Sequence, residues 1–321
     1  RDMSMAISEY APGCQIVANR RLITSTYLKI VQGRDRPLYK FGKCPKCNTA
    51  FIDRIADPSE EPKRSICPNC SVEVVLDKNM TIPEFGFVYK DTERATINKP
   101  RRSRGTNVYY RGGPNPNAES FEIGGISGTL SINTDDELVV ETNDQYYICD
   151  SCGFGCTGKI PKTHKTVFGS DCKGRLSPMR LGHVFRTDVA IIHFDKMVDG
   201  HSQAISVLYS IIEALCIDLQ VERSEISGCV RTLKDGTVDY ILFDNTPGGS
   251  GYVKAITIEM LPRLVDDALG IVSRCDCGGI EGEGSCYRCI QSYYNQPYHD
   301  VLSRGLAIKA LKGIRELMGS Q

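Results

Sequence analysis

The sequence predicts an α+β fold, in which a zinc-ribbon-containing β region is followed by an α/β zinc-binding domain. Twelve of the fifteen cysteines lie in three clusters, which divide the chain. Residues 119–148 alternate apolar and polar residues as antiparallel strands do, whereas residues 202–219 show helical periodicity. We therefore expect three units: an N-terminal zinc-ribbon β region at 1–118, a β segment with a second zinc knuckle at 119–185, and the α/β zinc-binding domain at 186–321.

Composition limits the classes of function. The chain has 321 residues, and 41% of them are hydrophobic, so it can bury a core without a disulfide framework. Its 39 basic and 39 acidic residues cancel, so any surface that binds nucleic acid must be local. No apolar run is long enough to span a membrane, and no membrane partner is expected.

Cysteine usage indicates the compartment. Cys-x-x-Cys pairs, an odd number of cysteines and the lack of an export signal favour metal sites in the reducing cytoplasm. The chain begins at Arg1 rather than at a methionine, so we expect it to be part of a longer polypeptide.

The first cluster predicts a zinc ribbon. It consists of Cys44-Pro-Lys-Cys47 and Cys67-Pro-Asn-Cys70, separated by a hydrophilic loop at 57–64. Each Cys-x-x-Cys turn directs two sulfurs at one point, and four thiolates suit tetrahedral Zn²⁺. Before this cluster, the apolar run 23–31 predicts a strand.

The second cluster predicts a further zinc site, for which the sequence leaves two candidates for the fourth ligand. Cys149, Cys152 and Cys172 are expected ligands, and the fourth is His164 or Cys156. His164 is favoured because Cys156 lies so soon after Cys152 that it would need a tight local path. The segment 153–159 imitates a phosphate-binding loop, but it lacks the Ser or Thr that holds Mg²⁺.

The third cluster predicts a structural zinc between two helices. Its ligands are Cys275, Cys277, Cys286 and Cys289, with a glycine-rich loop between the two pairs. Apolar periodicity predicts a helix at 202–219, and composition predicts helices at 252–272 and 303–317. Strands are expected at 188–194, 229–233 and 239–243. The complete set of cysteine clusters predicts two to three zinc ions as cofactor.

Two segments are candidates for contacts with nucleic acid. The first combines positive charge with aromatic rings, as single-strand binding requires, although a solvated loop has the same composition. Its residues are Arg101, Arg102, Arg104, Tyr109, Tyr110 and Arg111. The second is the loop 244–251, in which Gly248, Gly249 and Gly251 either leave N–H groups for a phosphate or form a tight turn.

No catalytic constellation is evident, so no catalytic residue is assigned. The five histidines do not cluster, and neither a Ser-His-Asp set nor a His-Glu-x-x-His motif occurs. The alternative is a metal-dependent hydrolase or nuclease that uses Asp244 and the glycine-rich loop. A further alternative is a module that only docks a protein.

Several segments resemble the MrfA-type zinc-binding domain, which lies C-terminal to the motor in superfamily-2 DEAD/DEAH helicases. The resemblance is closest over 181–304. It rests on Leu181–Asp188, on Phe243–Tyr252, on the four cysteines of the third cluster up to Ser292, and on Asn295 and Leu302–Arg304. Residues 7–13 and 83–87 resemble the zinc-bearing stretch that precedes this domain in some members. Related proteins include MrfA repair helicases and helicase-like proteins of DISARM and Druantia antiphage systems.

The resemblance implies that Cys275, Cys277, Cys286 and Cys289 bind zinc and that the protein takes part in DNA processing. It does not imply an ATPase here, because neither a complete Walker A motif nor a DEAD or DEAH box occurs. We therefore expect a non-catalytic accessory region of a DNA-repair or antiphage protein. Its expected partners are DNA, chiefly single-stranded, and a helicase motor in cis or in trans.

Overall fold

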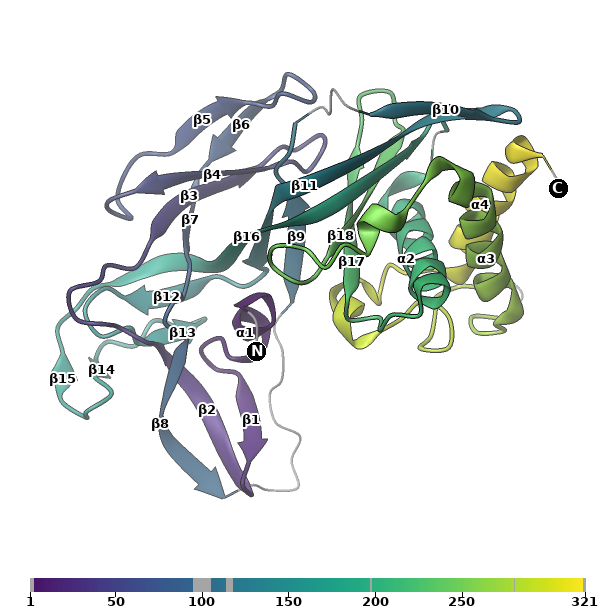
Figure 1. Cartoon of the computed structure of the whole chain (residues 1–321). Coiled ribbons are helices and arrows are strands. Elements are labelled where there is room, and N and C mark those ends of the chain that lie inside the picture. The colour runs from purple at the N-terminus through teal and green to yellow at the C-terminus, as the bar shows by residue number, and fades with distance from the viewer. Residues whose placement is uncertain (1–2, 95–104, 114–117, 197, 280, 320–321) are drawn as a thin grey trace.

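The computed structural model describes residues 3–94, 105–113, 118–196, 198–279 and 281–319. A strand-rich first part is followed by a helix-rich last part, so the predicted α+β class is confirmed (Figure 1). The helices are α1 (Met3–Glu9), α2 (Gly200–Leu219), α3 (Leu261–Arg274) and α4 (Arg304–Met318), and the 3₁₀ turns are η1 (Val253–Ala255), η2 (Ile258–Met260) and η3 (Tyr293–Tyr298). The strands are β1 (Gln15–Ala18), β2 (Arg21–Leu28), β3 (Leu38–Lys43), β4 (Ala50–Ile55), β5 (Lys63–Ile66), β6 (Glu73–Leu76), β7 (Lys78–Thr81), β8 (Phe87–Arg94), β9 (Thr106–Tyr110), β10 (Glu119–Ile123), β11 (Ile126–Thr142), β12 (Tyr146–Cys149), β13 (Gly155–Thr157), β14 (His164–Lys165), β15 (Asp171–Cys172), β16 (Leu176–Phe194), β17 (Ile226–Thr232) and β18 (Val238–Asp244).

Two long antiparallel strands, β11 and β16, form the centre of the largest sheet. Their pairing extends from Gly128 opposite Phe194 to Glu141 opposite Gly182. The register shifts near Asp135, whose φ of +60° is typical of a β-bulge. Strands β9 and β10 pair with β11 on its other edge.

Strand β16 connects the two parts of the molecule. Its first part pairs with β12 and, in parallel, with β7, and its last part pairs with β18. The predicted boundary between residues 185 and 186 lies inside this continuous strand. The division into 1–118, 119–185 and 186–321 therefore remains a prediction, and the last two units share one strand.

The helices α2, α3 and α4 lie together at one end of the sheet (Figure 1). Ile205, Leu208 and Leu215 of α2 are buried, as the helical periodicity predicts. Buried residues lie on almost all sides of α2, which is typical of a helix in the middle of a core. Among the described residues it is also the one helix long and apolar enough to cross a membrane, and 72% of its apolar window is buried inside the protein.

Most of the predicted elements of the last part are confirmed. The strands expected at 188–194, 229–233 and 239–243 correspond to the end of β16, to β17 and to β18. The last helix begins after Ser303, whose hydroxyl accepts a hydrogen bond from the Leu306 N–H. The helix expected from residue 252 is wrong at its start. Two 3₁₀ turns precede α3, because Thr257 between them is extended and Pro occupies the first turn of α3.

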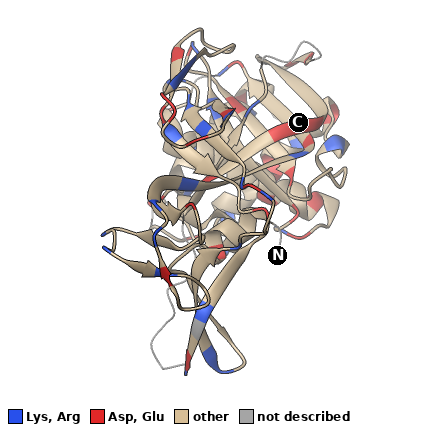
Figure 2. Cartoon of the chain, turned by 90° about the vertical axis from the view of Figure 1, so that its left-hand side faces the viewer, with Lys and Arg blue, Asp and Glu red and all other residues tan. Residues whose placement is uncertain are grey.

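The first part of the chain surrounds the other end of the sheet. Strands β3, β4 and β7 extend the largest sheet, and β5 and β6 form a separate hairpin beside them. Strands β1, β2 and β8 form a three-stranded arm that projects from the body (Figure 1). On the side shown in Figure 2, basic and acidic residues are interspersed, in line with the equal numbers of each in the sequence.

Candidate metal centres

The first centre is built by two matching turns between strands. Cys44 and Cys47 lie between β3 and β4, and Cys67 and Cys70 lie between β5 and β6. In each turn the N–H four residues after the first cysteine donates to that cysteine's carbonyl, at 3.0 Å and 2.8 Å. The donors, Asn48 and Ser71, have φ of +60° and +58°, so the chain turns back immediately after the second cysteine.

The two turns bring four sulfur atoms together in a buried pocket. All four lie within 4.8 Å of one another, and the four cysteines are buried. The sulfurs of Cys44 and Cys70 are 3.2 Å apart, and those of Cys47 and Cys67 are 3.5 Å apart. Sulfurs bound to one tetrahedral Zn²⁺ are about 3.8 Å apart, whereas a disulfide joins sulfurs at about 2 Å. The geometry therefore matches a four-thiolate zinc site.

The second centre lies on the β12 turn and on the hairpin of β14 and β15. Cys149, Cys152, His164 and Cys172 place their ligand atoms within 4.8 Å of one another. His164 and Cys172 face each other across the hairpin. The Nε2 atom of His164 is buried and has no hydrogen-bond partner within the described part of the chain. A metal ion would satisfy this nitrogen, since buried polar atoms usually have partners.

Cys156 is outside the second centre. It lies in β13, where it pairs with Tyr147. Of the two candidates for the fourth ligand, the structure therefore places His164, and not Cys156, with the three other cysteines.

The third centre joins the end of α3 to the start of α4. Cys275 and Cys277 follow α3, and Cys286 and Cys289 precede η3. Their sulfurs lie within 4.8 Å of one another, with 3.6 Å between Cys275 and Cys286 and 3.7 Å between Cys277 and Cys289. This is the arrangement expected for a structural zinc between the two helices.

A buried arginine supports the third centre, and the sequence did not identify its role. Arg304, in the first turn of α4, is 7% exposed. Its guanidinium donates to the carbonyl oxygens of Cys277 at 2.9 Å and Gly279 at 2.7 Å. The only signal in the sequence was its place in the segment that resembles the MrfA-type domain.

The chemistry of the donors fits zinc in all three centres. Burial raises the pKa of Cys44 to about 12 and that of Cys152 to about 12. These thiols would stay protonated at neutral pH without a cation, so zinc binding would release protons. Sulfur and imidazole ligands that fill a tetrahedron leave no open position for a substrate, so the ions would hold the fold.

The second centre gives a direct test of ligand identity. We expect His164→Ala to lower the zinc content by about one ion per chain and Cys156→Ala to leave it unchanged, because only His164 reaches the three sulfurs. Inductively coupled plasma mass spectrometry on freshly purified protein measures this difference. Loss of zinc in Cys156→Ala alone would reassign the fourth ligand.

The glycine-rich loop is closed around a carboxylate and does not present free N–H groups. The Asp244 side chain is 0% exposed and accepts from the N–H groups of Ser250, Gly251, Tyr252 and Val253, at 2.7, 2.6, 3.2 and 3.1 Å. The Gly248 N–H donates to the Arg186 carbonyl and the Gly249 N–H to the Thr246 carbonyl. The N–H groups of Gly248, Gly249 and Gly251 therefore all donate within the protein. The prediction that they contact a phosphate is wrong. The tight-turn alternative is confirmed by their φ values of +86°, +78° and +83°.

The aromatic residues of the predicted single-strand site are buried. Tyr109 is 8% exposed and Tyr110 is 4% exposed, and burial raises the pKa of both phenols. The Tyr110 hydroxyl donates to Asp136 at 2.6 Å, and the Arg231 guanidinium lies 5.4 Å from its ring centre. The prediction that these rings stack on bases is wrong, because the protein core already covers them.

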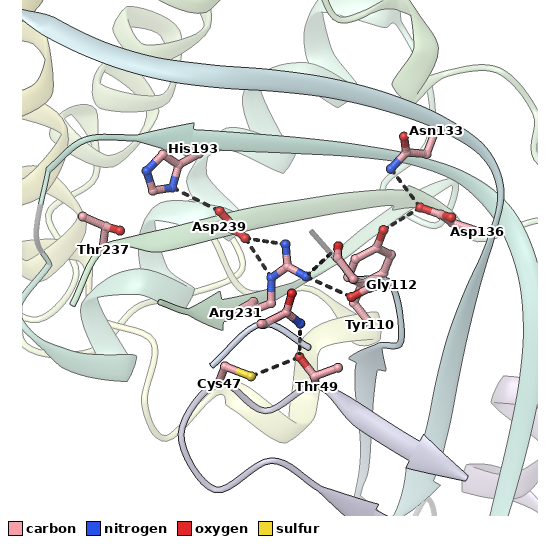
Figure 3. Close-up of polar contacts among 12 residues, drawn as sticks. Cys47, Thr49, Tyr110, Gly112, Asn133, Asp136, His193, Arg231, Thr237 and Asp239 are labelled. Atoms are coloured by element: carbon pink, nitrogen blue, oxygen red, sulfur yellow. Dashed lines mark hydrogen bonds and ion pairs between the residues drawn. The ribbon is translucent and has the colours of Figure 1, made fainter. Parts of the chain in front are cut away.

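The surroundings of Tyr110 form a buried polar network (Figure 3). Arg231 donates to the Asp239 carboxylate at 2.8 Å and to the Gly112 carbonyl at 3.0 Å. Asp239 in turn contacts His193 at 3.0 Å. These contacts tie β17 and β18 to the chain that leaves β9, so Arg231 acts as a structural link between parts of the fold.

Of the four arginines in the predicted single-strand site, the structure describes only Arg111. Arg111 forms an ion pair with Glu137 at 2.5 Å and is half-buried. Arg101, Arg102 and Arg104 lie outside the described residues.

Comparisons with known proteins agree with the resemblance seen in the sequence. Residues 207–290 match the family model described as the MrfA Zn-binding domain. The match includes all four cysteines of the third centre. Together with the three four-ligand groups, it confirms the predicted zinc cofactor, with sites compatible with two to three ions. The Druantia protein DruE of Escherichia coli (strain UMEA 4076-1) is 25% identical over 365 aligned residues, which cover 97% of this chain and 19% of DruE. The chain thus spans about a fifth of the length of this curated relative.

Two crystal structures of the DUF1998 helicase MrfA are also similar. The one bound to DNA aligns with 84% of this chain and 32% of its own, at 9% identity and a TM-score of 0.38. The one bound to DNA and AMPPNP aligns with 82% of this chain and 29% of its own, at 9% identity and a TM-score of 0.33.

Proposed function

We propose that this chain is a non-catalytic, zinc-binding accessory region of a helicase-type protein of DNA repair or antiphage defence. In this role it positions DNA, or a partner protein, against a motor that lies elsewhere in the polypeptide or in another protein. The observation that carries the proposal is the alignment with DruE, which covers 97% of this chain but only 19% of DruE. Such coverage is expected when a whole region recurs inside a larger protein.

The metal centres support an accessory role. Each has four ligands from the chain and therefore no open position at which zinc would activate water. The first centre also joins two separate turns, because Cys44 lies in the β3–β4 turn and Cys67 in the β5–β6 turn. Rigid, zinc-fixed turns are suited to holding a ligand in a constant position.

The burial of Asp244 weighs against the hydrolase or nuclease alternative. A catalytic carboxylate must reach substrate or a metal-bound water, but this one is 0% exposed and accepts four backbone hydrogen bonds. Opening the loop to free it would break all four bonds. These contacts favour a role for Asp244 in the fold over a role in catalysis.

Binding to DNA can be tested by fluorescence anisotropy with a labelled single-stranded oligonucleotide at two salt concentrations. We expect binding that weakens as salt rises, because phosphate contacts release counterions. The triple substitution of Arg101, Arg102 and Arg104 by Ala should weaken binding and reduce the slope of log K against log[salt] by about 2, or about 0.7 for each contact.

A matched control removes three arginines that are already paired. Arg263, Arg288 and Arg315 form ion pairs with Asp218, Asp276 and Asp266, and their replacement by Ala should leave the salt slope unchanged. If the wild-type protein binds neither single-stranded nor duplex DNA at low salt, the DNA-positioning role fails and the protein-docking alternative gains support.

A further inference from the structure

The most exposed hydrophobic side chain among the described residues is at the tip of the second zinc knuckle. Phe168 lies between β14 and β15 and is 97% exposed, whereas the next large hydrophobic residue, Ile66, is 62% exposed. Single exposed apolar residues are common on protein surfaces. A phenylalanine that contacts almost nothing in its own chain is different, because the whole ring is available to a ligand.

The knuckle holds this ring on a rigid base. The hairpin starts at His164 and ends at Cys172, and both residues belong to the second metal centre. At the tip, the Thr166 N–H donates to the Ser170 carbonyl at 2.8 Å and the Gly169 N–H donates to the Thr166 carbonyl at 2.9 Å. A fixed tip would lose little conformational entropy when the ring binds a ligand.

Contacts with the rest of the chain fix the hairpin further. The His164 ring stacks on Phe154 with 5.0 Å between ring centres. The Tyr27 hydroxyl of β2 donates to the Lys165 carbonyl at 3.1 Å. The knuckle is therefore attached to the projecting arm and to the metal centre at once.

The segment that carries Phe168 is rich in lysine, although the chain as a whole is neutral. Lys159, Lys162, Lys165 and Lys173 are exposed, and none of them forms an ion pair within the part of the chain that the structure describes. Between residues 155 and 175 the only acidic residue is Asp171.

A lysine from the arm adds to this charge. A Cβ atom placed on Gly169 would lie 4.0 Å from the Lys90 Nζ, so Lys90 of β8 is beside the tip. The strands β14 and β15 lie at the left in Figure 1, which is the side turned toward the viewer in Figure 2. The hairpin therefore combines an exposed ring at its tip with two exposed lysines, Lys165 of β14 and the neighbouring Lys90.

We infer that this hairpin is a contact site for single-stranded nucleic acid, in which Phe168 stacks on an unpaired base and the surrounding lysines contact the neighbouring phosphates. The combination of an aromatic platform with positive charge is what single-strand binding requires. The inference rests on the proposed function and gives it a contact site. It assigns to Phe168 the stacking role for which Tyr109 and Tyr110 are too deeply buried.

The test compares two fluorescein-labelled oligonucleotides of equal length, one with thymine bases and one abasic. Phe168→Ala should weaken binding of the thymine oligonucleotide by roughly tenfold, the loss of one base stack, and should leave binding of the abasic oligonucleotide unchanged. Phe168→Trp should restore affinity. Zinc content and melting temperature should stay at wild-type values, because the side chain is 97% exposed.

Two further variants complete the design. Ile66→Ala is the control for removal of an exposed apolar side chain elsewhere and should bind both oligonucleotides like the wild type. Replacing Lys159, Lys162 and Lys165 together by Ala should weaken binding of both oligonucleotides and lower the salt slope by about 2.

Three outcomes would overturn the inference in different ways. If the wild type binds the thymine oligonucleotide and Phe168→Ala binds it equally well, the hairpin contact is wrong while DNA binding stands. If Phe168→Ala instead loses only its binding to phosphatidylserine vesicles, the tip is a membrane contact. If the wild type binds neither oligonucleotide, the inference fails together with the single-stranded DNA-binding part of the proposed function.

Discussion

Replacing Cys286 by Ser is expected to remove about one zinc ion per chain and to destabilise the protein by about 4 kcal/mol or more. Cys286 is one of four ligands whose sulfurs lie within 4.8 Å of one another. A serine hydroxyl is a poor ligand for zinc, and the three remaining cysteines would lose the cation that stabilises their thiolate form. The loop between α3 and α4 would then lose its main cross-link.

Calorimetry together with zinc analysis measures this effect. For a protein of this size, such a loss lowers the melting temperature by roughly 10 °C. The matched control is Ser285→Ala at the adjacent position. The Ser285 hydroxyl is buried without a hydrogen-bond partner among the described residues, so its removal should be neutral. A Cys286→Ser protein that keeps its full zinc content and melts like the wild type would show that the third centre is not structural.

The metal centres were predictable from sequence because their geometry is largely local. A Cys-x-x-Cys turn places two sulfurs on one side of the chain whatever surrounds it. The first centre is complete once two such turns, Cys44–Cys47 and Cys67–Cys70, make a single tertiary contact with each other. Local periodicity likewise predicted the core helix α2.

The predicted DNA contacts were less successful because they depended on tertiary packing. Tyr109 and Tyr110 looked like exposed rings beside arginines, but β9 pairs with β11 and carries them into the core. Their burial follows from the pairing of β9 with a strand about 30 residues later in the chain, and the local sequence has no signal for this pairing. The exposure of Phe168 likewise has no signal in the local sequence, because phenylalanine is among the residue types most often buried.

The glycine-rich loop illustrates a further limit. The spacing of its glycines allows either a phosphate cradle or a turn around an internal group, because both need positive φ. The deciding feature is where the Asp244 side chain points, and it points inward to the N–H groups that would otherwise bind an anion. An internal carboxylate thus occupies the position that a phosphate would take.

Replacing Asp244 by Asn is therefore expected to destabilise the protein by about 3 kcal/mol or more, although the side chain keeps its size. The carboxylate accepts from three N–H groups through Oδ2 and from the Val253 N–H through Oδ1. An amide has one oxygen, so its NH₂ group must face at least one N–H donor inside the core. A buried donor without an acceptor, together with the loss of charge-assisted bonds, accounts for the expected cost.

Chemical denaturation of Asp244→Asn beside Asp235→Asn tests this role. Asp235 also accepts from a backbone N–H, that of Thr237 at 3.0 Å, but it lies in an exposed turn where water can replace the bond. Asp235→Asn should therefore change the free energy of unfolding by less than about 1 kcal/mol. Equal stability of the two variants would mean that the loop does not depend on the buried carboxylate, and Asp244 would again be available for a role outside the fold.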